Sequence, residues 1–327
     1  MKKLTVISPV YNVQSELEDY LTIIDAMSEK EDIQFVFVDD GSTDLSWNLL
    51  KAFKDRNPQM DIDLVHQKNR GVGHARNVGL DKAQGKYIWF TDPDDLFELQ
   101  LIMPIVKELE KRSGDLVFFQ YEKFSHKNDL VFGESMFDAS IIKTLDKLTM
   151  FRHYSIGKIE NYTWAFIATR ELYDSANIVF PNRNYEDVSV VFKIYNLAKK
   201  IYSYEDTVVY YRSRQSSIIH TFTSRNYDDF LIAIQELKDS SLDCPESIKN
   251  WYLFGKYCLM WDMLRNLDNV SERTIRQTEL KQKILEMDYK TLNVNKELVK
   301  LILSFNIHRL YRPFKIYGKI LGSLTPN

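Results

Sequence analysis

Three aspartates, Asp92, Asp94 and Asp95, lie within four positions of the chain. Carboxylates held this close repel one another strongly unless a cation lies among them. Mg²⁺ and Mn²⁺ bind oxygen ligands, commonly one or two carboxylates together with substrate phosphates and water. The cluster is therefore a candidate site for a divalent metal. Taken alone, it also fits a solvated turn in which Asp95 caps a following helix, because acidic turns are common.

A second acidic pair, Asp39 and Asp40, follows an apolar run at residues 33–38. A carboxylate in this position can accept a hydrogen bond from the imide N–H of uracil or from ribose hydroxyls. Upstream, Pro9 and Tyr11 end another apolar run, and an aromatic ring there offers a face on which a nucleobase can stack. A packed loop aromatic is the alternative role for the tyrosine. Together these positions predict a site that holds base, ribose and diphosphate in that order.

Two arginines, Arg70 and Arg76, belong to a run that also contains Gly71, Gly73 and Gly79. A planar guanidinium matches phosphate oxygens, and glycine lets the backbone approach a ligand closely. A surface ion pair is the alternative role for Arg76. A dinucleotide-binding motif is excluded, because Arg76 stands where the third glycine is required and the run follows the third apolar run of the chain.

These residues need a scaffold that brings them together. Four short apolar runs have the character of strands, at residues 4–8, 33–38, 62–66 and 87–91. They alternate with helical patterns at 16–28 and 45–53, which predicts an α/β fold with a mostly parallel sheet and helices on both faces. Ligands of such sheets bind beyond the carboxyl ends of the strands. Both aspartate clusters follow strands directly, so we expect them at one edge.

Taken together, these segments resemble family 2 glycosyltransferases with the Rossmann-like GT-A fold. The matching motifs run over residues 7–12, 36–44, 71–79 and 90–95. A later acidic pair, Glu186 and Asp187, opens an apolar helix and fits the same pattern. The resemblance covers residues 4–219, about two-thirds of the chain. It implies an inverting enzyme that transfers a sugar from a nucleotide sugar, with UDP as the nucleotide by analogy.

The resemblance also implies a role for each matching residue. The donor would contact Pro9, Tyr11, Asp39, Asp40, Arg70, Arg76 and Asp92. We expect Asp94 and Asp95 to bind the metal, although the sequence leaves open which of the three aspartates does so. His220 is a further candidate ligand, since imidazole suits Mn²⁺, with a structural histidine as the alternative. Trp164 is a candidate acceptor contact, but the family's Trp-x-Lys reads Trp-Ala-Phe here.

Asp187 matches the catalytic base of the family. A sugar hydroxyl that attacks an anomeric carbon needs a base for its proton, in line with the departing nucleoside diphosphate. One carboxylate and one metal are sufficient for a single displacement, whereas a covalent intermediate needs a second carboxylate. Glu186 does not supply it, since adjacent helical positions point about a hundred degrees apart. The alternative for the pair is favourable charge at a helix N-terminus.

Composition excludes several other classes of protein. The formal net charge of -3 does not suit a nucleic-acid binder. Two cysteines, Cys244 and Cys258, form no disulfide framework or zinc-ligand spacing, which is typical of a reducing compartment. No segment approaches the ~20 apolar residues of a membrane span, and the first residues turn polar too soon for a secretory signal. We therefore expect a cytoplasmic protein, either soluble or peripheral on the inner face of the membrane.

The end of the chain is basic and aromatic. From residue 296 onward it carries one acid, Glu297, and six basic residues: Lys296, Lys300, Arg309, Arg312, Lys315 and Lys319. Interleaved with apolar residues, this composition fits a segment that lies on an anionic membrane surface. A helix that packs on the protein, or a contact in an oligomer, explains it as well.

Together with the resemblance, the sequence predicts a GT-A catalytic domain at 1–225 and a helical extension at 226–327. Within the catalytic domain, 1–95 would bind the UDP-sugar and 96–225 a glycan or lipid-linked glycan acceptor, with Mn²⁺ or Mg²⁺ as cofactor. A sugar nucleotidyltransferase is disfavoured because no glycine-rich, lysine-bearing phosphate loop follows the first strand. A nucleotide-sugar sensor or scaffold is disfavoured because a pure binder has no need for Asp187.

Overall fold

The computed structural model describes residues 2–125, 130, 136–155, 158–213, 222–240, 244–292 and 296–304. The chain forms two compact units. One comprises Met1–Asp146 and Asn161–Arg214, and the other comprises Lys147–Glu160 and Gln215–Asn327. The division of the catalytic domain into a donor half and an acceptor half is a functional one and stays a prediction.

The first unit is built on one mixed sheet, which has nine strands within the described residues. The strands are β1 (Leu4–Val10), β2 (Ile33–Asp39), β3 (Asp61–His66), β4 (Tyr87–Phe90), β5 (Leu96–Phe97), β6 (Leu116–Phe124), β7 (Ile142–Leu145), β8 (Phe166–Thr169) and β9 (Ile201–Arg212). Their order is β3-β2-β1-β4-β8-β6-β9-β5, and β7 also pairs with β9. The four strands predicted from the sequence are the parallel group β1 to β4.

Strand direction decides which strand ends meet. β8 runs antiparallel to both β4 and β6, so β6 has the direction of β4, and β9 runs parallel to β6. The carboxyl ends of β1, β2, β4, β6 and β9 therefore lie at one edge of the sheet, together with the residues that precede β8. Parallel strands of this kind are buried on both faces, and every residue of β1 and β2 is buried.

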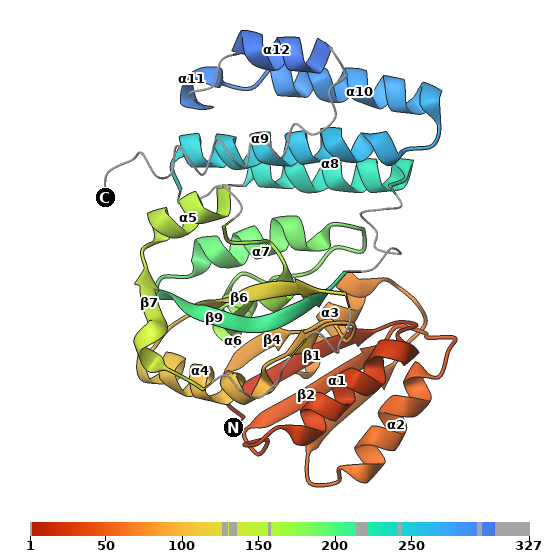
Figure 1. The fold of residues 1–327 in the computed structure, drawn as a ribbon, viewed down its shortest axis with the longest axis vertical. Helices are drawn as coiled ribbons and strands as arrows, with labels where there is room; N and C mark the ends of the chain where they lie inside the picture. The colour runs from red at the N-terminus through yellow and green to blue at the C-terminus, as the bar shows by residue number, and fades with distance from the viewer. Residues whose placement is uncertain are drawn as a thin grey trace. The chain divides into compact units, whose positions relative to one another are not determined.

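Helices cover both faces of this sheet (Figure 1). α1 (Gln14–Ala26), α2 (Ser46–Arg56) and α4 (Leu99–Lys111) share one core with the side chains of Phe35, Phe37 and Trp89. α3 (Val72–Lys82), α6 (Arg170–Ser175) and α7 (Glu186–Leu197) pack on the other face, where Phe90 meets α6 and Phe166 meets α7 through aromatic contacts. The predicted α/β fold with a mostly parallel sheet is confirmed.

The second unit is helical, in agreement with the helices predicted for 226–327, but it also takes in 147–160 and 215–225, which the prediction assigned to the catalytic domain. Its helices are α5 (Lys147–Ser155), α8 (Ser224–Asp239), α9 (Glu246–Met263), α10 (Val270–Leu285), α11 (Tyr289–Leu292) and α12 (Lys296–Ser304). α9 is its centre, with α8 alongside (Figure 1) and α5 joined to it by stacked rings of Tyr154 and Tyr252, 4.4 Å apart. Cys258 is buried in α9, and burial raises the pKa of its thiol.

Only the start of the basic C-terminal segment falls within the described residues. Lys296 and Lys300 belong to α12, whose Val299 and Leu303 are buried. Arg309, Arg312, Lys315 and Lys319 lie outside the described residues, so membrane binding by this segment stays a prediction. No helix of the described part of the chain is long and apolar enough to cross a membrane.

Candidate active site

The acidic cluster forms at the carboxyl edge, just after β4. One carboxylate oxygen from each of Asp92, Asp94 and Asp95 lies within 4.8 Å of the others. Asp95 is 1% exposed; its Oδ1 accepts a hydrogen bond from the Arg212 backbone N–H at 2.8 Å, and its Oδ2 is buried with no hydrogen-bond partner among the described residues. Burial and the neighbouring charge of Asp92 raise the pKa of Asp95 well above its usual range. These features fit a cation between the carboxylates.

The helix-cap alternative for Asp95 is wrong. β5 follows Asp95 directly, and α4 begins only at Leu99 with Glu98 as its N-cap residue. β5 is anchored by antiparallel pairing with β9, in which Leu96 meets Tyr210. The two-residue strand therefore holds the acidic loop against the end of β9.

Arg212, at the end of β9, fixes this loop from the other side. Besides its backbone bond to Asp95, its Nε donates to the Asp94 carbonyl at 2.7 Å. Its Nη2 lies 3.6 Å from Asp19 Oδ2, and its guanidinium lies 4.7 Å from the centre of the Phe124 ring. Arg212 thus determines the position of two of the candidate metal ligands.

Arg76 lies in α3 and is buried, with 5% of its surface exposed. Its guanidinium forms an ion pair with Glu186, at the start of α7, and another with Asp92 at 3.4 Å. Burial alone would lower the pKa of Arg76, but the charges of Glu186, Asp92 and Asp187 raise it above its usual value. Arg76 is therefore the centre of a buried ion-pair group and not a surface ion pair. Its contact with a diphosphate stays a prediction.

The glycines of the 71–79 run serve packing within the protein. A Cβ on Gly73 would lie 2.4 Å from the Pro181 carbonyl oxygen, and Gly71 has φ +89°, a conformation that favours glycine. Asn77 adds two hydrogen bonds of 2.8 Å with the backbone of Phe180. The start of α3 is thereby held against the segment that leads into α7. The neighbour that approaches Gly73 closely is thus the protein's own backbone, and those that approach Gly71 and Gly79 are the side chains of Asn182 and Ile7.

Asp187 lies in the first turn of α7 and is partly buried. Its Oδ2 accepts a hydrogen bond of 3.0 Å from the Asn161 side-chain amide. The negative charge of Asp187, like that of Asp92, raises the pKa of Arg76. The candidate base and the acidic cluster are therefore parts of one site, joined by Arg76.

Asp39 and Asp40 are buried at the end of β2, where they hold the chain that follows β3. Asp40 accepts hydrogen bonds from the backbone N–H groups of Arg70 and Gly71, at 2.9 and 2.8 Å. Asp39 Oδ2 lies 2.6 Å from the Nδ1 of His66. Asp39 Oδ1 is buried and has no hydrogen-bond partner among the described residues, so this carboxylate can still accept a hydrogen bond.

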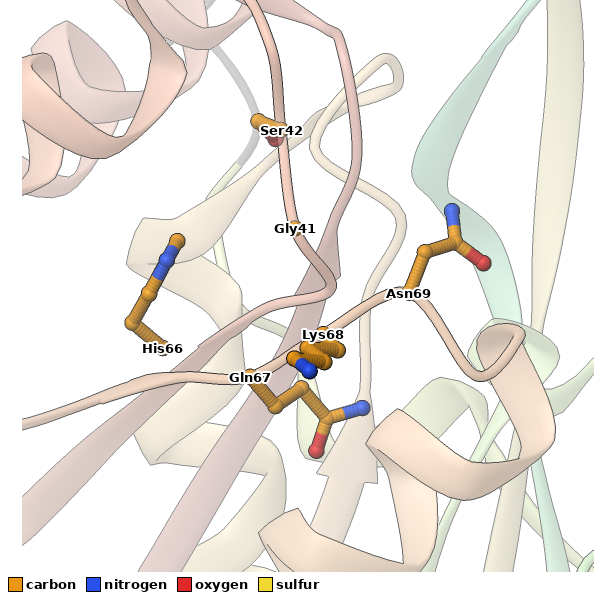
Figure 2. Close-up of a pocket in the computed structure, with 6 residues that line it drawn as sticks. All are labelled: Gly41, Ser42, His66, Gln67, Lys68 and Asn69. Carbon is orange, nitrogen blue, oxygen red and sulfur yellow. The ribbon is translucent and has the colours of Figure 1, made fainter.

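An open pocket of about 510 Å³ lies beside these carboxylates. It is lined by Gly41, Ser42, His66, Gln67, Lys68 and Asn69. Figure 2 shows the side chains of His66 and Asn69 on either side of the backbone at Gly41. A Cβ on Gly41 would lie 2.8 Å from the Asn69 nitrogen, and its φ of +77° also favours glycine.

Three further predicted residues have distinct environments. Tyr11 is 48% exposed beyond the end of β1. Pro9 is buried within β1 opposite Val38, so it shapes the strand end from inside. The Arg70 side chain is exposed at the end of the loop after β3. His220 lies outside the described residues.

Residues 5–172 match the model of the family described as glycosyl transferase family 2. The chain belongs to this family. Its curated relatives include glycosyltransferase GlyA of Streptococcus pneumoniae, which is 27% identical over 228 residues. That alignment covers 68% of this chain and 32% of GlyA, so the chain spans about a third of the length of this relative.

Two solved structures share the fold of this family 2 chain. Residues 1–349 of Staphylococcus aureus TarS in complex with UDP-GlcNAc have a TM-score of 0.69 at 17% identity, covering 97% of this chain and 92% of that one. The mannosyltransferase PcManGT of Pyrobaculum calidifontis with GDP-Man and Mn²⁺ has a TM-score of 0.58 at 16% identity, covering 98% and 87%. The predicted GT-A fold is confirmed.

Sequence reasoning missed Arg212 and Asn161 in this family 2 site. Arg212 lies at the end of β9, and its bonds to the acidic loop cannot be inferred from the sequence because they join residues far apart in the chain. Asn161 carries no sequence signal of its own, because its role depends on the 3.0 Å contact with Asp187.

Proposed function

We propose that the chain transfers a sugar from a UDP-sugar to a hydroxyl of a glycan or lipid-linked glycan acceptor, with inversion at the anomeric carbon. The single observation that carries this proposal is the buried Arg76, which joins the acidic cluster through Asp92 to the start of the helix that carries Asp187. A base and an acidic cluster in one site are what a metal-assisted displacement requires.

The acidic cluster fits a divalent metal. Its three carboxylate oxygens lie close together, and Asp95 Oδ2 is buried with no hydrogen-bond partner among the described residues. Asp94 and Asp95 would hold Mn²⁺ or Mg²⁺. The metal would neutralise charge that develops on the departing diphosphate. Asp92 instead forms an ion pair with Arg76. In this position Asp92 would hold the acidic loop in place and contact the donor.

The nucleotide would occupy the edge formed by the ends of β1, β2 and β3. The buried Asp39 Oδ1 is available to accept the imide N–H of uracil, which favours a uridine nucleotide. The exposed ring of Tyr11 is available for stacking on the base. The relative TarS was solved with UDP-GlcNAc, which agrees with this choice of nucleotide.

Asp187 would take the proton of the acceptor hydroxyl as that oxygen attacks the anomeric carbon. Asn161 holds the carboxylate through its amide, which limits the rotation of the base. The neighbouring Glu186 is buried and paired with Arg76, so it does not serve as a second nucleophilic carboxylate. One base without a second nucleophile supports a single displacement with inversion.

The Asp187→Asn variant tests this proposal. We expect sugar transfer to fall by about 10²- to 10⁴-fold, because the amide does not accept the hydroxyl proton. UDP binding, measured by calorimetry, should stay unchanged. Full activity in the variant would remove Asp187 from its role. UDP binding without turnover in the unchanged protein, across donors and acceptors, would indicate a sensor or scaffold.

A further inference from the structure

A cluster of aromatic rings at the same edge joins Trp164, the acceptor contact expected from the sequence, to three tyrosines that have no role so far. Its members are Tyr121 of β6, Tyr162 and Trp164 of the segment just before β8, and Tyr211 of β9. The rings of Tyr162, Trp164 and Tyr211 are nearly parallel, with centroid separations of 4.8, 5.9 and 5.7 Å and interplanar angles of 10° to 26°. Tyr121 meets Trp164 edge-on at 5.2 Å.

The topology brings these rings to the functional edge. Tyr121 and Tyr211 lie near the carboxyl ends of β6 and β9, which run in the direction of β4. Trp164 belongs to the short 3₁₀ helix Thr163–Ala165, directly before the antiparallel β8. A register shift in β6 between Phe119 and Tyr121 alters the pairing just before the tyrosine. Such irregularities occur beside active sites, where they redirect a side chain.

Two residues of the cluster are neighbours in sequence of residues that hold the candidate base or the candidate metal ligands. Tyr162 follows Asn161, whose amide bonds Asp187. Tyr211 precedes Arg212, which binds the backbone of Asp94 and the carboxylate of Asp95. The rings are therefore joined through the backbone to the residues that hold the candidate base and the candidate metal loop.

Burial distinguishes Trp164 from Tyr162 and Tyr211. Trp164 is only 2% exposed, and its carbonyl oxygen accepts a hydrogen bond of 3.0 Å from the Trp89 indole. It is therefore a support and not a contact surface, contrary to the acceptor contact expected for it. Tyr162 and Tyr211 remain partly exposed. Rigid aromatic side chains of this kind give contact area at a low cost in conformational entropy.

We propose that Tyr162 and Tyr211 form a stacking surface for one sugar ring of the acceptor. The C–H groups on the face of a sugar ring are apolar and weakly positive, and they match the negative face of an aromatic ring. The Nζ of the exposed Lys123 lies over the Tyr211 ring, 5.8 Å from its centre, so a sugar that stacks on this face would displace the lysine side chain or form a hydrogen bond with it. This inference rests on the proposed function and adds the site that orients the acceptor.

Position in the sheet argues for an acceptor sugar over the donor base. The proposed nucleotide site is at the ends of β1, β2 and β3, whereas the rings belong to β6, β9 and the start of β8. In the order of the sheet these two groups of strands lie on opposite sides of β4. A bound donor would thus leave the aromatic surface for the second substrate.

Binding of simple glycosides to the intact chain tests the proposal. The probes are the methyl glycosides of glucose, galactose, mannose and N-acetylglucosamine, titrated by saturation-transfer NMR with saturating UDP and the diamagnetic Mg²⁺. We expect saturable binding of at least one probe. Tyr162→Leu and Tyr211→Leu, which keep apolar bulk but remove the ring, should each weaken it about three- to tenfold. Tyr162→Phe and Tyr211→Phe should stay within about twofold of the unchanged protein.

Tyr11→Leu is the matched control on the donor side. It should weaken UDP binding and leave glycoside binding at saturating UDP unchanged, while the Tyr162 and Tyr211 variants should show the reverse. The stacking surface is overturned if no glycoside binds the unchanged protein, or if both leucine variants bind it as before. If the unchanged protein neither bound UDP nor hydrolysed a donor, that result would instead contradict the proposed function itself.

Discussion

The donor side and the acceptor side of the site hold their carboxylates in different ways. We define the donor side as the segments after β1, β2 and β3, and the acceptor side as residues 161–164, the first turn of α7 and the end of β9. On the donor side, backbone N–H groups of Arg70 and Gly71 hold Asp40, in addition to the side-chain amide of Gln67. On the acceptor side, the Asn161 side chain holds Asp187. Backbone-held geometry follows from strand ends, whereas side-chain-held geometry depends on single residues.

Arg76 connects the two sides, so its substitution should have the largest effect of those considered. Arg76→Met leaves Glu186 buried without its partner, and we expect the free energy of unfolding to fall by about 3–5 kcal/mol. Urea denaturation measures the loss. Adding Glu186→Gln to the same chain should recover part of it, because the unpaired charge is then gone. Unchanged stability in the single variant would mean that the two sides are independent.

Gly73 tests the packing that holds the acceptor side in place. Gly73→Ala puts a Cβ 2.4 Å from the Pro181 oxygen, so α3 and the segment before α7 have to move apart. We expect a loss of about 1–3 kcal/mol in the free energy of unfolding, measured by thermal denaturation. Val72→Ala, one position earlier at an exposed site, should change it by less than about 0.5 kcal/mol. Equal effects of the two substitutions would contradict this account of the glycine.

Asp39 tests whether the donor side binds the base of UDP. Asp39→Asn replaces the buried acceptor oxygen offered to uracil, and we expect UDP affinity to fall about tenfold. Isothermal calorimetry with UDP and GDP measures both the loss and its dependence on the base. Asp55→Asn, at an exposed position of α2, is the control and should bind UDP normally. An unchanged UDP affinity in Asp39→Asn would place the base elsewhere.

Asn161 should give the smallest effect, confined to the acceptor side. Asn161→Ala removes one hydrogen bond to Asp187, so we expect turnover to fall about three- to tenfold. The affinity for UDP should not change, since the donor side keeps its backbone contacts. Steady-state transfer kinetics and calorimetry measure the two quantities. A loss of UDP affinity equal to the loss of turnover would show that the two sides are not separable in this way.

The sequence could predict what strand ends position, but not the contacts between single side chains. The apolar runs before Asp39 and Asp92 predicted strands, and the direction of parallel strands then placed both clusters at one edge. The partners of Arg76 could not be predicted, because Glu186 lies 110 positions further along the chain. Arg212 also escaped prediction, since its bonds depend on β5, a strand of two residues that is too short for any periodicity. Trp164 was expected at the acceptor from a motif, but the structure buries it and leaves its neighbours Tyr162 and Tyr211 partly exposed.

Donor hydrolysis tests the central claim most directly. The intact chain is incubated with a panel of UDP-, GDP- and dTDP-sugars, with Mn²⁺ or with a chelator, and the release of nucleoside diphosphate is measured. We predict release from a UDP-sugar that depends on the metal and is lost in Asp94→Asn and Asp95→Asn. Equal release in the presence of chelator, or no release and no UDP binding with any donor, would contradict a metal-dependent transfer from UDP-sugars.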